Sequence, residues 1–156
     1  MSQSFIKKII SCEEFEKVAS DIFNCHKNDN EKYGHALGLK HDYSLIRDSL
    51  NHESLLIWNI HVWAHFNGKD WDGIFIGFIR KSEKFNKKIM DEYLWLSKNS
   101  NSGMRLYMEA SKYAKENNCE YILMHCVKNT PVFEKLKKFY LKQGFEKDFE
   151  TYIKKL

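Results

Sequence analysis

The segment that decides the fold is residues 89–127, with the sequence IMDEYLWLSKNSNSGMRLYMEASKYAKENNCEYILMHCV. Ile89–Ser97 is an apolar run of strand length, and Lys98–Gly103 is a polar loop that ends in glycine. Residues 104–117 then carry apolar side chains at helical spacing, and residues 120–127 are apolar again. This order of strand, loop, helix and strand is typical of a parallel crossover unit, in which ligands bind at the N-terminus of the helix.

The N-terminal segment predicts a strand followed by a helix. Residues 5–10 are apolar enough for a strand. Ser11 followed by Glu14 is a capping-box signature, which predicts a helix from Cys12 to about Lys27. We expect the polar run Asn28–Tyr33 to end that helix.

The middle of the chain predicts a second, short helix and then strands. Residues 42–50 fit the helix, and residues 55–66 and 74–80 are apolar runs typical of strands. Together with Ile89–Ser97, these two strands predict an antiparallel meander.

The C-terminal segment predicts a last helix and a last strand. Pro131 suits the first turn of a helix that runs to about Lys142, and Gly144 suits its C-terminal cap. Residues 145–155 then predict a strand. The expected order is β-α-α-β-β-β-α-β-α-β, an α/β fold with a mixed sheet. Because no repeat or Pro/Gly-rich linker interrupts the chain, we expect a single domain over residues 1–156.

The composition excludes several classes of protein. Of 156 residues, 43% are hydrophobic and 15% aromatic, too many for intrinsic disorder. No apolar stretch approaches the length of a membrane span, and the N-terminus lacks a signal-peptide pattern, so we expect a cytoplasmic protein. The four cysteines form no CxxC pair, and we expect free thiols and no metal site. His61 and His65 would be far apart on a strand, so we interpret both as structural.

The charge is divided unevenly along the chain. Residues 1–78 hold 8 Lys/Arg and 11 Asp/Glu, a net charge of −3, whereas residues 79–156 hold 17 and 10, a net charge of +7. A basic half favours an anionic partner, either a phosphate-bearing molecule or a nucleic acid, although many of these lysines fit an ordinary solvated surface. Nucleic acid is the less favoured partner, because the lysines are not interleaved with aromatic residues.

The loop from Asn99 to Arg105 is the most informative candidate site. A helix N-terminus presents backbone N–H groups and a positive dipole end to an anion. Gly103 would let the backbone approach a phosphate closely, and Arg105 would add positive charge. The loop therefore predicts a phosphate site.

Four segments carry a resemblance to a known family: Ser102–Leu106, Ala114–Cys119, Phe139–Phe145 and Tyr152–Leu156. Together they resemble the GNAT N-acetyltransferases, most closely the short bacteriophage members, over about residues 72–156. The resemblance implies a mixed, mostly antiparallel sheet flanked by helices. It also implies an enzyme that transfers the acetyl group of acetyl-CoA to a primary amine by direct attack.

The resemblance also implies the acetyl-CoA site and the catalytic groups. Backbone groups around Leu94, Trp95 and Leu96 would bind the pantetheine arm, with Asn129 contacting CoA. The pyrophosphate would bind the helix N-terminus, and the expected contact residues there are Asn101, Ser102, Gly103, Met104, Arg105 and Leu106. Tyr140 matches the general acid that protonates the departing thiolate.

The sequence offers three candidates for the general base. Glu92 stands where many family members keep a carboxylate, and strand alternation places it on the face of Met90 and Leu94. Asp91 would point to the opposite face, and either acid could instead be a solvated charge. His125 is the third candidate because imidazole titrates near neutral pH, although a structural role is the commoner one.

Two further alternatives stay open: a substrate pocket lined by tryptophans, and a protein with this fold but without catalysis. The tryptophans Trp58, Trp63, Trp71 and Trp95 could line a substrate pocket, but core packing is the commoner role. The loop lacks the leading Arg/Gln and the final small residue of the family pattern, so an inactive GNAT-fold binding protein, such as a phage product that engages a host factor, stays as a rival. The amine acceptor and the formation of a homodimer are both left open by the sequence.

Overall fold

The computed structural model describes residues 3–33, 59–83, 86–126, 130 and 132–147. The chain divides into two compact units. The first unit comprises Met1–His26 and Tyr43–His125, and the second comprises Lys27–Asp42 and Cys126–Leu156. The single domain over residues 1–156 stays a prediction.

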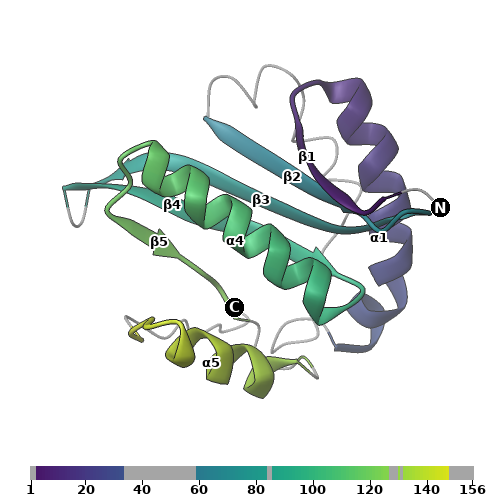
Figure 1. Cartoon of the computed structure of the whole chain (residues 1–156). Helices are drawn as coiled ribbons and strands as arrows, with labels where there is room; N and C mark the ends of the chain where they lie inside the picture. Colours follow the sequence, from purple (N-terminus) through teal and green to yellow (C-terminus); the bar gives the residue numbers. More distant parts are fainter. Residues whose placement is uncertain (1–2, 34–58, 84–85, 127–129, 131, 148–156) are drawn as a thin grey trace, which may run out of the picture. The chain divides into compact units, whose positions relative to one another are not determined.

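A five-stranded sheet in the order β1-β2-β3-β4-β5 forms the centre of the first unit (Figure 1). Its strands are β1 (Phe5–Ile9), β2 (Ile60–Phe66), β3 (Trp71–Ser82), β4 (Lys87–Ser97) and β5 (Tyr121–Leu123). The first four strands pair in antiparallel fashion, and β5 pairs with β4 in parallel after the crossover through α4 (Ser100–Glu116). The predicted meander and parallel crossover are therefore confirmed.

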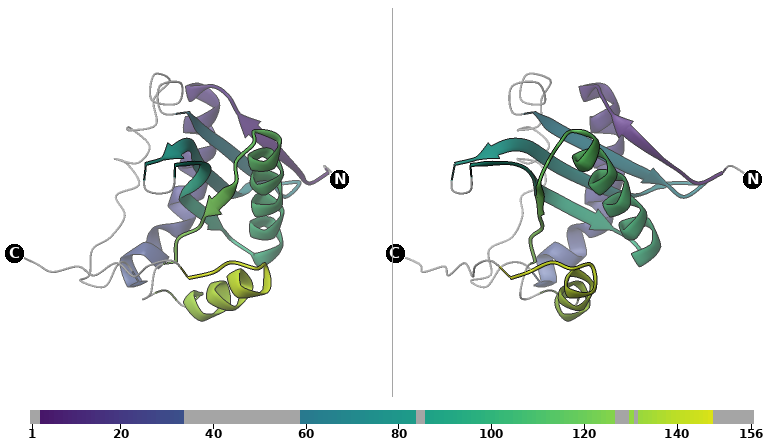
Figure 2. Two further views of the ribbon diagram at one scale, coloured as in Figure 1. Left: turned by 90° about the vertical axis from the view of Figure 1, so that its left-hand side faces the viewer. Right: turned by 60° about the vertical axis from the view of Figure 1, so that its left-hand side comes forward.

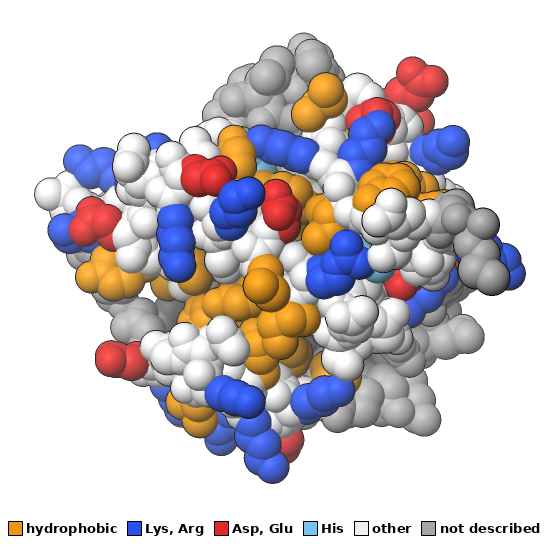
Figure 3. Space-filling model, in the orientation of Figure 1, with side chains coloured by type: hydrophobic (Ala, Val, Ile, Leu, Met, Phe, Trp, Pro, Cys, Tyr) orange, Lys and Arg blue, Asp and Glu red, His pale blue; other side chains and the backbone are white. Residues whose placement is uncertain are grey.

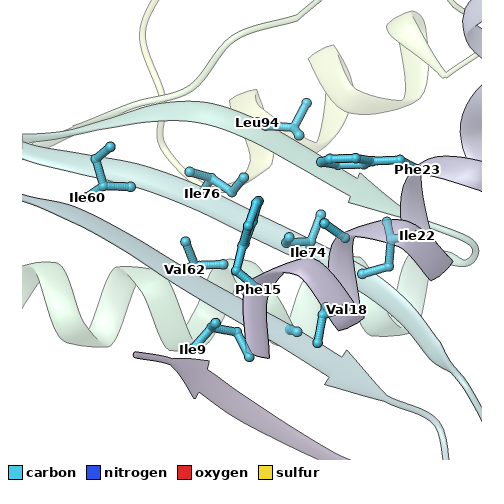
Figure 4. Close-up of a cluster of buried hydrophobic side chains, with 12 residues drawn as sticks. Ile9, Phe15, Val18, Ile22, Phe23, Ile60, Val62, Ile74, Ile76 and Leu94 are labelled. Atoms are coloured by element: carbon cyan, nitrogen blue, oxygen red, sulfur yellow. The ribbon is translucent and has the colours of Figure 1, made fainter. Parts of the chain in front are cut away.

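Helices α1 (Cys12–Tyr33) and α4 cover opposite faces of this sheet (Figure 2). Successive strand residues point to opposite faces, so each strand contributes to two apolar clusters. Figure 4 shows the cluster under α1, where Phe15 and Ile22 pack against Val62, Ile74 and Ile76. The cluster under α4 contains Trp63, Phe75, Ile79, Met90, Leu106, Ala110 and Ala114. The two clusters fix α1 and α4 against the sheet, and so position the residues of β4 and of the start of α4.

A bulge in β4 reverses the alternation that the sequence predicted. Glu92 is paired with Gly77 and Leu94 with Ile76, so Tyr93 is an extra residue in the ladder. A bulge shifts the following side chains to the other face. Met90 accordingly belongs to the α4 cluster and Leu94 to the α1 cluster. The prediction that Met90 and Leu94 share a face is therefore wrong.

The helix boundaries differ from the predictions at two ends. The Ser11 hydroxyl accepts a hydrogen bond of 3.2 Å from the N–H of Glu14, so α1 begins as predicted. The helix then continues to Tyr33, because the polar residues expected to end it are tolerated in its last turns. Helix α4 begins at Ser100, earlier than expected, because the Asn99 side chain caps its first turn.

The second unit contains α5 (Phe133–Lys142). Gly144 has a φ of 82°, and the N–H of Phe145 bonds to the carbonyl of Tyr140 at 3.0 Å, the pattern of a Schellman cap. The predicted helix end is therefore confirmed. Pro131, the short helix over 42–50, the first part of the predicted strand at 55–58 and most of the predicted last strand lie outside the described residues.

On the face of the molecule drawn in Figure 3, several Lys and Arg side chains lie beside Asp or Glu side chains. Among the described residues, Lys112 pairs with Glu116 at 3.9 Å and Lys87 with Glu120 at 2.6 Å. These pairs fit the solvated lysine surface that the composition left open. No helix in the described part of the chain is both long and apolar enough to cross a membrane.

Candidate active site

Glu92 lies on β4 next to the point where β4 and β5 stop pairing. It stands opposite Gly77 of β3, and the parallel ladder ends one residue earlier, at Asp91 and Leu123. The Glu92 side chain is buried, with only 7% of the residue exposed. Its Oε2 accepts a hydrogen bond of 2.7 Å from the backbone N–H of His125. The His125 N–H lies just beyond the last β4–β5 pair, so it donates to the Glu92 carboxylate rather than within the strand ladder.

The environment of Glu92 raises its pKa to about 7. Burial is the main cause, because it disfavours the charged carboxylate, and the nearby Asp91 adds to the effect. The hydrogen bond from the His125 backbone and the charge of His125 oppose the rise. A carboxylate with such a pKa can accept and release a proton near neutral pH.

Asp91 and His125 lie beside Glu92 and are bonded to each other. The Nε2 atom of His125 is 3.0 Å from Asp91 Oδ1, and Arg80 donates to Asp91 Oδ2 at 2.7 and 3.1 Å. Burial alone would raise the pKa of Asp91, but the hydrogen bonds from His125 and Arg80 hold it below its ordinary value. The hydrogen bond to Asp91 is the main reason that the pKa of His125 is raised. The three candidate bases therefore form one cluster.

The N-terminus of α4 is capped by a side chain of the protein itself. Asn99 Oδ1 accepts hydrogen bonds from the N–H groups of Asn101 at 3.0 Å and Ser102 at 2.9 Å. The Gly103 N–H bonds to the Asn99 carbonyl at 3.2 Å. The amide groups that the sequence assigns to a phosphate are thus bonded to Asn99 in this structure.

Gly103 is also required by packing. A Cβ at this position would lie 2.6 Å from Ser97 Oγ and 3.5 Å from the Trp95 ring. The Ser97 hydroxyl in turn donates to the Asn99 carbonyl at 2.8 Å. Close approach of α4 to the end of β4 therefore explains this glycine without any ligand.

Sequence reasoning missed a buried network at the same end of α4. His65 Nδ1 lies 2.6 Å from Asp72 Oδ1, and Asp72 Oδ2 accepts from Asn99 at 3.0 Å. Arg105 lies 2.9 Å from His65 Nε2 and donates to the Ser4 hydroxyl at 2.7 Å. Because the guanidinium can only donate, His65 Nε2 accepts and the proton is on Nδ1, which donates to Asp72. His65 is thus a neutral bridge between a carboxylate and a guanidinium.

A sequence signal for this network exists. His65 precedes and Asp72 follows the turn that begins at Asn67-Gly68, and pairing across a hairpin brings such positions together. The interpretation of His65 as structural fits its burial, with 4% of the residue exposed. Arg105 contacts this network, and its role toward a phosphate stays a prediction.

The other expected cofactor residues lie around the end of β4 and the start of α4. Leu94 and Leu106 are buried in the two apolar clusters, and Leu96 and Trp95 pack against these clusters. Met104 is half-buried in the second turn of α4. Any contact that Leu94 makes with a ligand would therefore come from its backbone. Asn129 lies outside the described residues.

Tyr140 lies on α5 in the second unit. Its ring packs against Phe139, with ring centres 5.6 Å apart, and against Phe145 at 5.2 Å. These contacts fit the alternative of a packing role, and the general-acid role stays a prediction.

The remaining candidates have structural surroundings. The His61 ring packs against the Tyr113 ring at a tilt of 57°, with ring centres 4.8 Å apart, and burial and the charge of Lys8 lower the pKa of His61 to about 4. Trp63 is buried in the α4 cluster, as the core-packing alternative expected, while Trp58 lies outside the described residues. The described part of the chain contains no group of three or more metal-ligating side chains, and neither Cys119 nor Cys126 is in a disulfide bond.

Comparisons with known proteins identify the fold. No family model and no curated protein matches the sequence. An aminoglycoside acetyltransferase from an uncultured soil metagenomic sample superposes with a TM-score of 0.68 at 13% identity, over 100% of this chain and 99% of that one. The ribosomal-protein-alanine N-acetyltransferase of Brucella melitensis biovar Abortus 2308 gives 0.66 at 11%, over 98% and 99%. A GNAT family acetyltransferase of Staphylococcus aureus gives 0.62 at 12%, over the whole of both chains. The chain therefore has the fold of GNAT acetyltransferases.

Proposed function

We propose that this protein is an acetyl-CoA-dependent N-acetyltransferase that acts on a primary amine of a small molecule or a protein. The fold supports acetyl transfer in general. The observation that carries the proposal is the buried Glu92 carboxylate, whose pKa is raised to about 7 beside the end of the β4–β5 ladder. A general base is most effective when its pKa lies near the working pH.

In the proposed mechanism, Glu92 removes a proton from the bound ammonium group, and the resulting amine attacks directly. Acetyl-CoA supplies the thioester carbonyl that is attacked. Tyr140 then protonates the thiolate, which a phenol can do because its ordinary pKa is near 10. His125 and Asp91 lie close enough to Glu92 to influence its proton affinity.

The donor site is proposed at the end of β4 and the start of α4. β5 pairs with β4 only as far as Asp91, whereas β4 continues to Ser97. The resemblance assigns this later part of β4 to the pantetheine arm and the first turn of α4 to the pyrophosphate. A phosphate oxygen would take the place of Asn99 Oδ1 on the amides of Asn101 and Ser102.

The acceptor is proposed only as a primary amine. The solved structures with this fold include an aminoglycoside acetyltransferase and a ribosomal-protein-alanine N-acetyltransferase, so the fold accommodates both small molecules and proteins. A bacteriophage origin and a cytoplasmic location are parts of the same proposal that rest on the sequence alone.

A second candidate function is a GNAT-fold binding protein without catalysis. The observation that favours it is the occupation of the α4 amides by Asn99, which is held in place by Asp72. In this case the cap keeps these two amides from a phosphate, and the protein transfers no acetyl group to any acceptor.

A calorimetric titration with acetyl-CoA tests the donor site, and a turnover assay against a panel of amines tests catalysis. We expect binding together with a rise in melting temperature, because a ligand that binds only the folded state stabilises it. Absence of binding at millimolar acetyl-CoA would refute the proposal. Binding without turnover on any acceptor would favour the inactive binding protein.

A further inference from the structure

A continuous chain of contacts leads from the surface to Glu92. Arg80 donates to Asp91, Asp91 bonds the His125 imidazole, and the His125 backbone N–H donates to Glu92. The His125 side chain is 53% exposed, whereas that of Asp91 is 18% exposed. His125 follows β5 beyond its last strand pair, so the β4–β5 ladder does not fix its backbone. Two contacts tie this residue to β4: the imidazole bonds Asp91, and the backbone N–H donates to Glu92.

We propose that Asp91 is a positioning residue for Glu92: by holding the His125 imidazole, it fixes the backbone amide that His125 donates to the Glu92 carboxylate. This inference rests on the proposed function of Glu92 as general base. It gives Asp91 and His125, the two other candidate bases, a role that acts through Glu92. Arg80 completes the arrangement by holding the second oxygen of Asp91.

The physical basis is the stabilisation of an ionised carboxylate by a hydrogen bond. An amide that donates to the carboxylate favours the charged form and lowers the pKa. If the His125 amide moves away, the pKa of Glu92 rises further and less base is available at neutral pH. In the described part of the chain, the charged groups that act on Glu92 are Asp91 and His125, with Arg80 paired to Asp91.

The alternative is that His125 acts on Glu92 only through its positive charge. Two substitutions separate the alternatives. His125→Gln removes the charge but keeps a side-chain amide that can donate to Asp91, whereas His125→Ala removes both the charge and the tether. Positioning predicts that the titration midpoint of Glu92 lies higher in His125→Ala than in His125→Gln, by about one pH unit. A pure charge effect predicts equal midpoints.

The role of Asp91 is tested by repeating this comparison in an Asp91→Ala background. Without Asp91 the glutamine loses the carboxylate that bonds the imidazole in the wild type, so the difference between the Gln and Ala variants should vanish. Such a cycle isolates the coupling between the two positions. A difference that persists unchanged without Asp91 would overturn the proposal, as would the absence of any difference with Asp91 present.

The measurement is ¹³C NMR of the full chain labelled at glutamate carboxyls, with the Glu92 signal assigned by its loss in Glu92→Gln. Thermal melting of every variant checks that the fold is retained, and His125→Ser replaces His125→Ala if the alanine variant melts early. Calorimetry with acetyl-CoA on the unmodified protein keeps the two proposals apart. Failure to bind acetyl-CoA removes the catalytic function, whereas equal Glu92 midpoints remove only the positioning role.

Discussion

Two buried carboxylates on neighbouring strands of the sheet have opposite surroundings. Asp72 on β3 has hydrogen bonds at both oxygens, from His65 at 2.6 Å and from Asn99 at 3.0 Å. Glu92 on β4 accepts a backbone hydrogen bond, and its pKa is raised to about 7. The comparison teaches that two buried carboxylates of one sheet can have different partners: side chains bond both oxygens of Asp72, whereas a backbone N–H bonds Glu92. Asp72 is bonded to side chains that hold α4 in place, whereas Glu92 can change its protonation near neutral pH.

The largest expected effect is that of Glu92→Gln on turnover. Glutamine cannot take a proton, so kcat/KM should fall on the order of 10³-fold. Steady-state assays with an identified acceptor measure this loss, with Glu116→Gln on the surface of α4 as the control. In the unmodified enzyme, kcat/KM should rise as the pH passes through about 7, because Glu92 becomes ionised there. Full activity in Glu92→Gln would show that another group is the base.

Asp72→Ala should have its main effect on stability. Removal of the carboxylate leaves the Asn99 amide and His65 Nδ1 without their buried acceptor, which should lower the free energy of unfolding by about 3 kcal/mol. Urea denaturation at pH 5 measures it, with Glu92→Gln as the matched variant that should stay near wild type at this pH. If Asp72→Ala had the same free energy of unfolding as the wild type, the contrast between the two carboxylates would be lost.

The pH dependence of stability should distinguish Glu92 from an ordinary carboxyl group. Its pKa in the folded state, about 7, lies above the ordinary value of 4.5. Between these values the folded state binds more protons than the unfolded state, so stability falls as the pH rises. Relative to Glu92→Gln, the wild type should therefore lose roughly 3 kcal/mol between pH 4 and pH 8. Urea denaturation of both proteins at several pH values measures this loss. If the free energies of unfolding of the wild type and Glu92→Gln changed in parallel with pH, the raised pKa would be contradicted.

Tyr140→Phe tests the proposed acid in the second unit. Loss of the hydroxyl should lower kcat roughly 10²-fold with a parallel fall in kcat/KM, since the interaction is made in the transition state. The affinity for acetyl-CoA should change little, because the ring can still pack against Phe139 and Phe145. If turnover is normal and only the melting temperature falls, Tyr140 has a packing role.

The smallest expected effect is that of Asn99→Ala. Loss of the N-cap should lower the free energy of unfolding by about 1 kcal/mol. Acetyl-CoA should bind no more weakly than to the wild type, because the freed N–H groups of Asn101 and Ser102 are those assigned to the pyrophosphate. Calorimetry and thermal melting check both parts. Weaker binding would mean that Asn99 itself contributes to the donor site.

The sequence predicted the elements of the first unit because their periodicity is strong. The strands predicted at 5–10, 74–80 and 89–97 are present at Phe5–Ile9, Trp71–Ser82 and Lys87–Ser97. These strands, the helix after Ser11 and, in the second unit, the helix end at Gly144 follow from apolar spacing and cap residues, which act over a few positions. The sequence also singled out Glu92, Asp91 and His125 separately. It failed at the start of α4, because it took Asn99 as part of a loop rather than as the cap that begins the helix.

Only the tertiary structure decided how those residues meet. The bulge at Tyr93 sets which face each β4 side chain takes, and no local pattern reveals the register of one strand on another. The meeting of Glu92 with the His125 amide depends on where the β4–β5 ladder ends. The His65–Asp72–Arg105 network likewise joins positions 40 residues apart in the chain. Burial and hydrogen bonding between distant segments, which determine the pKa of Glu92, are properties of the folded chain rather than of any stretch of sequence.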